Sequence, residues 1–183
     1  PWLLAVMFAA YSGQWLAVIG FLPTIYNDAG LSGLVVAMLT ALVAIINAAG
    51  NVLGGRLLHL GWQPERLIML VFALMGLMTW ITFSPLFAEQ VSWQFAAVLI
   101  FSAAGGIIPA ILFALAVQRT PRSDLVPVTI GWVQQMSAFG QLSTPPLIAL
   151  VATWVGGWHL TWLMTGGLSL LGIVLAWRLS FVR

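Results

Sequence analysis

Six long apolar stretches, each more than 20 residues long, run through the sequence with only short polar breaks between them. A helix needs about 20 mostly apolar residues to cross the roughly 30 Å hydrocarbon core of a bilayer. Charged residues, proline, asparagine and glycine mark the breaks. The pattern predicts an all-α polytopic membrane protein with six transmembrane helices. We expect these helices at residues 2–25, 31–58, 67–87, 93–117, 128–154 and 158–179.

The composition supports a lipid environment. Hydrophobic residues make up 62% of the chain and charged residues only 5%, too few to cover the surface of a water-soluble domain. The lipid bilayer is therefore the first expected partner. The net charge of +2 comes from dispersed arginines and does not indicate nucleic-acid binding, and the absence of cysteine excludes a thiolate metal site. We expect no cofactor and no metal.

The arginines predict the orientation of the chain. All of them lie in or beside the loops after the second and fourth spans or at the C-terminus, and the opposite side has none. Short cytoplasmic loops carry an excess of basic residues, so both ends of this segment are expected to be cytoplasmic and Asp28, Glu89 and His159 to face outward. We expect an integral protein of the cytoplasmic membrane of a bacterium. The arginines are Arg56, Arg66, Arg119, Arg122, Arg178 and Arg183.

Polar side chains inside the spans indicate which helices line a cavity, because such groups need partners or water within a bilayer. Amides occur in the first, second and fifth spans, whereas the third and sixth have none and are expected to be peripheral. At helical spacing the polar residues form one stripe on each of the three amide-bearing spans, and we expect the stripes to converge. The alternative is that each amide only bonds a neighbouring helix, as we expect for Gln135. The cavity candidates are Tyr11, Gln14, Trp15, Asn47, Asn51, Gln134 and Gln141.

Small residues and prolines predict how the helices pack. Gly50 and Gly54, four residues apart, favour close packing of two helices. Pro109 in the fourth span and the pair Pro145 and Pro146 in the fifth remove backbone donors, so we expect kinks there. Bent helices suit a carrier, but they also occur in static bundles.

Six spans with both ends cytoplasmic resemble one half of a major facilitator superfamily carrier. The loop from Gly54 to Trp62 is similar to a weakened copy of the family's signature loop, with Arg56 kept and no acidic residue, as in C-terminal halves. The stretches 11–15, 21–24, 28–31 and 47–61 are similar to the cyanate and nitroimidazole transporter branch. The resemblance implies that residues 1–183 form one six-helix half of a twelve-span protein whose N-terminal half is missing.

The same resemblance implies a function. A carrier of this family moves a small-molecule substrate by alternating access, with the first, second, fourth and fifth spans facing the central cavity. It also makes Gly55, Arg56 and Glu65 candidates for a cytoplasmic gate. No charged residue or histidine lies in the interior of any span. The substrate is therefore neutral or polar, or the other half supplies the charge.

Other functions fit the sequence less well. Gly167-Leu168-Ser169 is similar to a serine-protease turn, but no histidine follows His159 to activate the serine. Paired carboxylates inside the spans are also missing, so we do not expect an enzyme. The Asn-Pro-Ala loops of an aquaporin and an acidic filter ring are absent. A six-span channel of another kind and a structural membrane subunit remain alternatives.

Overall fold

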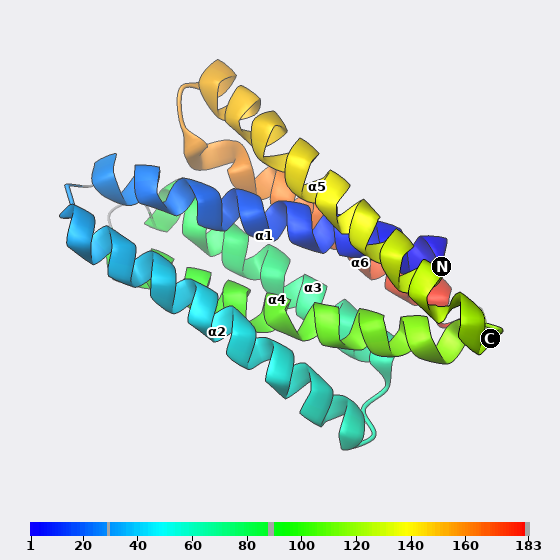
Figure 1. Cartoon of the computed structure of the whole chain (residues 1–183). Coiled ribbons are helices and arrows are strands. Elements are labelled where there is room, and N and C mark those ends of the chain that lie inside the picture. The colour runs from blue at the N-terminus through cyan, green and yellow to red at the C-terminus, as the bar shows by residue number, and fades with distance from the viewer. Residues whose placement is uncertain (29, 88–89, 182–183) are drawn as a thin grey trace.

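The computed structural model describes residues 1–28, 30–87 and 90–181. The side chain of Asp28, and Glu89 and Arg183, for which we predicted a side of the membrane, lie outside the described residues. Figure 1 shows a bundle of long helices that alternate in direction and are joined by short connections. The prediction of six transmembrane helices is confirmed, since six helices among the described residues are long and apolar enough to span a bilayer. They are α1 (Trp2–Asp28), α2 (Gly33–His59), α3 (Pro64–Phe83), α4 (Val91–Arg119), α5 (Val126–Val155) and α6 (Thr161–Leu179).

In the described parts of the connections lie three short 3₁₀ turns: η1 (Pro85–Phe87), η2 (Ser123–Leu125) and η3 (Trp158–Leu160). The structure differs from the expected span 67–87, because α3 ends at Phe83 and η1 follows. Ser84 is extended, with φ −70° and ψ 136°, because a residue that precedes a proline is driven out of the helical region. At the other break, Gly156 adopts a left-handed conformation with φ 72° and ends α5.

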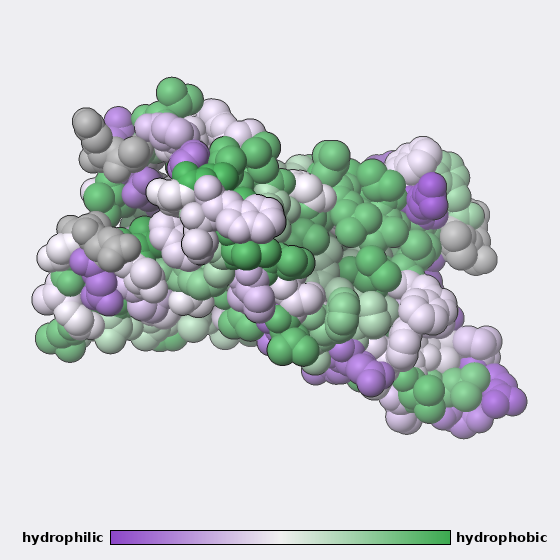
Figure 2. Space-filling model, turned by 90° about the horizontal axis from the view of Figure 1, so that it is seen from above, coloured by the Kyte–Doolittle hydropathy of each residue, from purple (hydrophilic) through white to green (hydrophobic). Residues whose placement is uncertain are grey.

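Figure 1 also shows that both ends of the chain lie at the same end of the bundle. Arg56, Arg119 and Arg178 occupy the last turns of α2, α4 and α6, so they lie at this end as well. In Figure 2 hydrophobic residues cover much of the middle of the molecule, and hydrophilic residues gather mainly towards its two ends. This distribution is what a bilayer requires.

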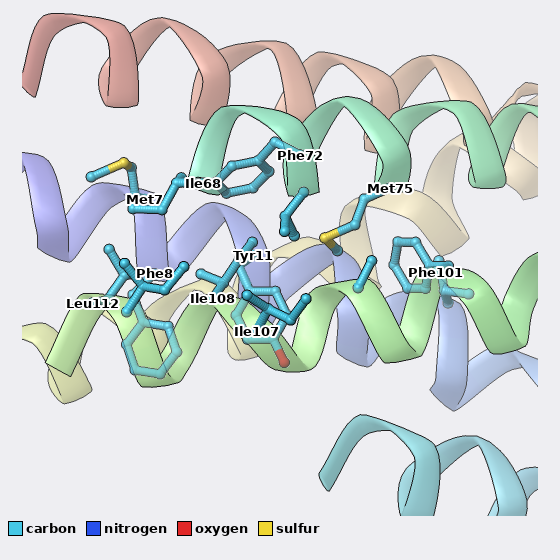
Figure 3. Packing of buried hydrophobic residues seen from close by; sticks show 14 of the residues in the cluster. Met7, Phe8, Tyr11, Ile68, Phe72, Met75, Phe101, Ile107, Ile108 and Leu112 are labelled. Atoms are coloured by element: carbon cyan, nitrogen blue, oxygen red, sulfur yellow. The ribbon is translucent and has the colours of Figure 1, made fainter. Parts of the chain in front are cut away.

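The helices pair in an order that differs from their order in the chain. α1 packs most extensively against α5, α2 against α4, and α3 against α6 and α4. The buried apolar core lies mainly between α1, α3 and α4, where Phe8, Phe72, Phe101 and Ile108 are buried (Figure 3). α3 and α6 form one side of the bundle, and α2 and α5 pack mainly on α4 and α1, respectively.

Close contacts between glycines and backbone atoms bring these pairs together. A Cβ on Gly106 of α4 would lie 2.0 Å from the carbonyl oxygen of Asn47 on α2, and one on Gly50 would lie 2.0 Å from that of Ala103. Gly140 of α5 similarly approaches Ala9 of α1. In lipid, where no hydrophobic effect drives helices together, such contacts supply the packing energy. The packing role expected for Gly50 is therefore what the structure shows.

Candidate functional site

A polar network in the middle of the spans connects α1, α2 and α4. The side-chain amide of Asn47 on α2 donates hydrogen bonds to the main-chain carbonyl oxygen of Ser102 on α4, at 2.9 Å, and to the hydroxyl oxygen of Tyr11 on α1, at 3.2 Å. Tyr11 is buried, and in Figure 3 its hydroxyl points away from α3. Asn47 thus links the three helices.

The hydroxyl of Ser102 extends this network. Its oxygen accepts a hydrogen bond from the indole nitrogen of Trp15 at 3.1 Å, and it donates to the carbonyl oxygen of Val43 at 2.8 Å. Ser102 is fully buried, whereas Trp15 and Asn47 are partly exposed. The network therefore holds two side chains in fixed orientations while part of each remains accessible.

Local sequence explains why Asn47 can reach both neighbours. Gly50 lies about one turn after Asn47 on α2, and Gly106 lies about one turn after Ser102 on α4. These glycines let the two backbones touch. A larger residue at either position would push α2 away from α4, because its Cβ would overlap a carbonyl oxygen. The small residues thus set the distance at which the Asn47 amide meets the Ser102 carbonyl.

A second polar cluster connects α1 to α5. The hydroxyl of Ser12 donates to the carbonyl oxygen of Ser137 at 3.0 Å, and the amide of Gln141 donates to the hydroxyl oxygen of Ser137 at 3.2 Å. Close by, a Cβ on Gly13 would lie 2.2 Å from the hydroxyl oxygen of Thr144. Gln141 is itself exposed, so this cluster borders the outer face of α5.

The structure brings together some of the sequence candidates and separates others. Tyr11, Trp15 and Asn47 share the first network, and Gln141 belongs to the second. Asn51 and Gln134 are exposed on α2 and α5, with no hydrogen bond to another described residue that would place them in either network.

Gln14 lies apart from both networks. It is fully buried, and its side-chain oxygen accepts a hydrogen bond at 3.1 Å from the hydroxyl of Ser169 on α6. Its amide nitrogen has no partner among the described residues. Residues three apart usually share a helix face, but Gln14 contacts α6 whereas Tyr11 contacts α2, so the two side chains do not meet in one cluster.

Sequence reasoning missed the part that Ser102 plays. Ser102 is not among the cavity candidates predicted from the sequence, yet its hydroxyl bonds both Trp15 and α2. The signal was present in the serine four residues before Gly106, on a face of small residues that admits a neighbouring helix.

The expected gate residues are placed at the arginine-bearing end. Glu65 at the start of α3 forms an ion pair with Arg119 at the end of α4, and Arg119 also donates to the carbonyl oxygen of Leu179 on α6 at 3.2 Å. Arg56 is exposed and forms no ion pair with a described residue, and Gly55 faces open space. Arg119 therefore fastens α4 to α3 and α6 within this bundle.

The chemistry of the candidate site is neutral. Its hydrogen-bonding groups are an amide, a phenol, an indole and a hydroxyl, which can hold a polar solute but carry no formal charge. Within the described part of the chain, no group of three or more His, Cys, Asp or Glu residues could hold a metal ion. The arrangement is suited to binding a solute by hydrogen bonds.

Comparison with known proteins identifies a family and a relative of this chain. The family model described as Major Facilitator Superfamily matches residues 3–183. The chain is 28% identical to human monocarboxylate transporter 11 over 150 residues, which cover 79% of this chain and 32% of that protein. The chain thus spans about a third of the length of this curated relative. The expected similarity to the cyanate and nitroimidazole branch stays a prediction.

Proposed function

Because this chain belongs to the Major Facilitator Superfamily, we propose that it is the C-terminal half of a twelve-span carrier that moves a small solute by alternating access. Its six apolar helices place it in lipid. The family and the human relative point to transport rather than to catalysis. Alternating access, the missing half and the solute are the parts of the proposal that require experiment.

The observation that carries the proposal is the network around Asn47 and Ser102. Polar groups in the middle of membrane spans are costly unless they have a function or a partner. Here each polar group is bonded to another helix, yet Trp15 and Asn47 keep accessible surface. This combination suits a solute site, in which fixed donors and acceptors must meet a substrate that enters and leaves.

The faces of α2 and α5 support the presence of a second half. In their most apolar windows only 17% of α2 and 22% of α5 is buried, against 67% of α1. Asn51, Gln134 and Gln141 are exposed on these two helices. Amides in contact with hydrocarbon are unfavourable, so we propose that the other half and a water-filled cavity between the halves cover these faces.

The substrate follows from the chemistry of the network. A small polar solute without net charge fits the neutral donors and acceptors of Tyr11, Trp15 and Asn47. A monocarboxylate is the second candidate, favoured by similarity to the human transporter. Its charge would then be balanced by the other half, because the described residues at the centre of these spans carry none.

The arginine-bearing end is proposed to be the cytoplasmic side. The ion pair of Glu65 with Arg119 holds α3 to α4 inside this half, so it would move with the half as a rigid unit. Arg56 and Gly55 lie on exposed surface at the end of α2 and remain the candidates for contact with the other half when the cytoplasmic side closes.

Counterflow in proteoliposomes tests the carrier. The full-length protein is reconstituted, vesicles are loaded with unlabelled solute, and uptake of radiolabelled solute is compared with unloaded vesicles across neutral polar solutes and short monocarboxylates. A carrier exchanges faster than it delivers net uptake, so loaded vesicles should show an overshoot. Asn47→Ala should abolish most of the overshoot, whereas Ser143→Ala, whose hydroxyl bonds only its own helix, should retain it.

The rival functions give different results. A channel would show flux that does not saturate and is not accelerated by solute on the opposite side. A structural subunit would show no specific flux for any solute. Either result, obtained with protein that unfolds cooperatively, would contradict the proposal.

A further inference from the structure

A separate cavity lies at the end of the bundle opposite the arginines. It has a volume of about 380 Å³ and is formed by the last turns of α1, the end of α3, the start of α4 and η3. In Figure 1 this is the end away from the two chain termini. Tyr26 on its wall is about 16 Å along α1 from Trp15, at 1.5 Å per residue, so the cavity is distinct from the Asn47 network.

Aromatic contacts hold the walls of this cavity in place. The ring of Trp158 in η3 packs on that of Phe21 with centroids 4.6 Å apart, and the ring of Tyr26 packs edge to face on that of Phe95 at 6.2 Å. These contacts fasten η3 and α4 to the end of α1. The cavity is thus built by packing between elements rather than by a single loop.

The wall is apolar over most of its surface. Leu22, Phe83 and Trp158 contribute hydrocarbon and ring surface. No Asp, Glu, Lys or Arg is among the described lining residues, and His159 is exposed at the rim. A charged ligand would therefore lose its hydration without gaining an opposite charge.

One buried polar group on the wall has no partner among the described residues. The side chain of Tyr26 is buried, and its hydroxyl oxygen bonds no other described residue. The hydroxyls of Thr82 and Ser84, also on the wall, do have partners. The Thr82 hydroxyl donates to the carbonyl oxygen of Met78 at 2.8 Å, and the Ser84 oxygen accepts from the backbone nitrogen of Leu86 at 3.3 Å. A buried hydroxyl without a partner costs free energy, which a ligand that accepts its hydrogen bond would recover.

We propose that this cavity binds an uncharged amphiphile dissolved in the membrane, an aliphatic alcohol in its simplest form. The ligand's hydroxyl oxygen accepts a hydrogen bond from Tyr26, and its hydrocarbon chain lies against Leu22, Phe83 and Trp158. The volume falls within the range of about 300–1,000 Å³ of small-molecule sites. The site is independent of the solute pathway proposed above, and binding does not require transport.

Photolabelling with an octanol that carries a diazirine tests the proposal. The full-length carrier in phosphatidylcholine nanodiscs is irradiated with the probe, and labelled peptides are identified by mass spectrometry. We expect saturable labelling within residues 22–26 and 82–85, competed by unlabelled octanol. Tyr26→Phe, which removes only the hydroxyl, should reduce this labelling at least fivefold.

Matched variants make the result decisive. Tyr11→Phe changes the chain's second tyrosine, in the Asn47 network, and should leave labelling of the cavity unchanged. Leu22→Phe adds bulk to the wall and should reduce labelling even if Tyr26→Phe fails to fold. Labelling that does not saturate and spreads over lipid-facing residues such as Leu34 and Leu77 would overturn the proposal, as would equal labelling of wild type and Tyr26→Phe. A wild-type cavity that takes no label and holds only water would overturn it as well.

Discussion

The indole nitrogen of Trp15 on α1 lies 3.1 Å from the hydroxyl oxygen of Ser102 on α4, and the same hydroxyl donates to α2. One small side chain therefore joins three spans and fixes the direction of a large aromatic ring. Because Trp15 is partly exposed, its orientation determines the shape that a solute would meet. The consequences of this arrangement and of the packing around it can be tested by single substitutions.

Ser102→Ala should weaken both stability and solute binding. It leaves the Trp15 indole nitrogen without its acceptor and removes the additional hydrogen bond to the Val43 carbonyl, which we expect to cost about 1–3 kcal/mol, and it frees the ring to rotate. The apparent unfolding temperature in detergent should fall, and KM for uptake should rise more than kcat falls. Ser143→Ala, on α5, is the control and should change stability by less than about 0.5 kcal/mol. Normal stability and unchanged KM in Ser102→Ala would show that Ser102 does not position the site.

Gly140→Ala should disrupt the pairing of α1 with α5. The added Cβ would lie 2.2 Å from the carbonyl oxygen of Ala9, so the helices must separate at a cost of about 1–3 kcal/mol. Gly131→Ala, on the same helix, has nothing within 4 Å and should stabilise α5 by up to about 1 kcal/mol. Thermal unfolding of the two variants should therefore shift in opposite directions. Equal shifts would contradict the packing of α5 described above.

Glu65→Gln should destabilise the arginine-bearing end. The Glu65 side chain is 16% exposed and that of Arg119 31%, so their ion pair is poorly screened and we expect a loss of about 1–2 kcal/mol. Asp124→Asn breaks the pair with Arg122, in which the two side chains are 66% and 67% exposed, and should cost less than about 0.5 kcal/mol. Unfolding temperatures of both variants at low salt provide the comparison. If Asp124→Asn is the more damaging, the ranking by burial is wrong.

Gln14→Met should be nearly neutral. It removes an amide nitrogen that has no partner among the described residues and replaces it with an apolar side chain of similar length. Ser169 loses its acceptor, but its hydroxyl can donate to its own helix as that of Thr165 does to Thr161. Stability should change by less than about 1 kcal/mol, and uptake should stay within twofold. A tenfold loss of uptake in a normally stable variant would restore Gln14 as part of the solute pathway.

The helices could be predicted from the sequence because length and hydropathy alone decide which segments span a bilayer. The boundary of α3 could not, since the apolar residues continue past Phe83 and the local effect of Pro85 ends the helix. Composition indicates where a chain can enter lipid, whereas backbone sterics decide where each helix stops.

The candidate site was predicted in part for a similar reason. Asn47, Tyr11 and Trp15 stand out because amides and polar aromatic residues are rare inside spans. Ser102 does not stand out, because serine occurs in membrane helices as a small packing residue as well as a hydrogen-bonding one. The face to which Gln14 turns depends on where α6 packs, and no periodicity within α1 records the position of α6.

The pairing of α1 with α5, of α2 with α4 and of α3 with α6 constrains how the chain is assembled during synthesis. The two helices of each pair are not consecutive in the chain. Each of these three contacts therefore has to wait until the later helix has left the ribosome. Gly13 has no Thr144 to pack against until α5 is inserted, and Gln14 has no Ser169 until α6 follows. A nascent chain that stops after α4 therefore keeps a groove of small residues and an unpaired amide in lipid, and its bundle closes only when the last helix enters the membrane.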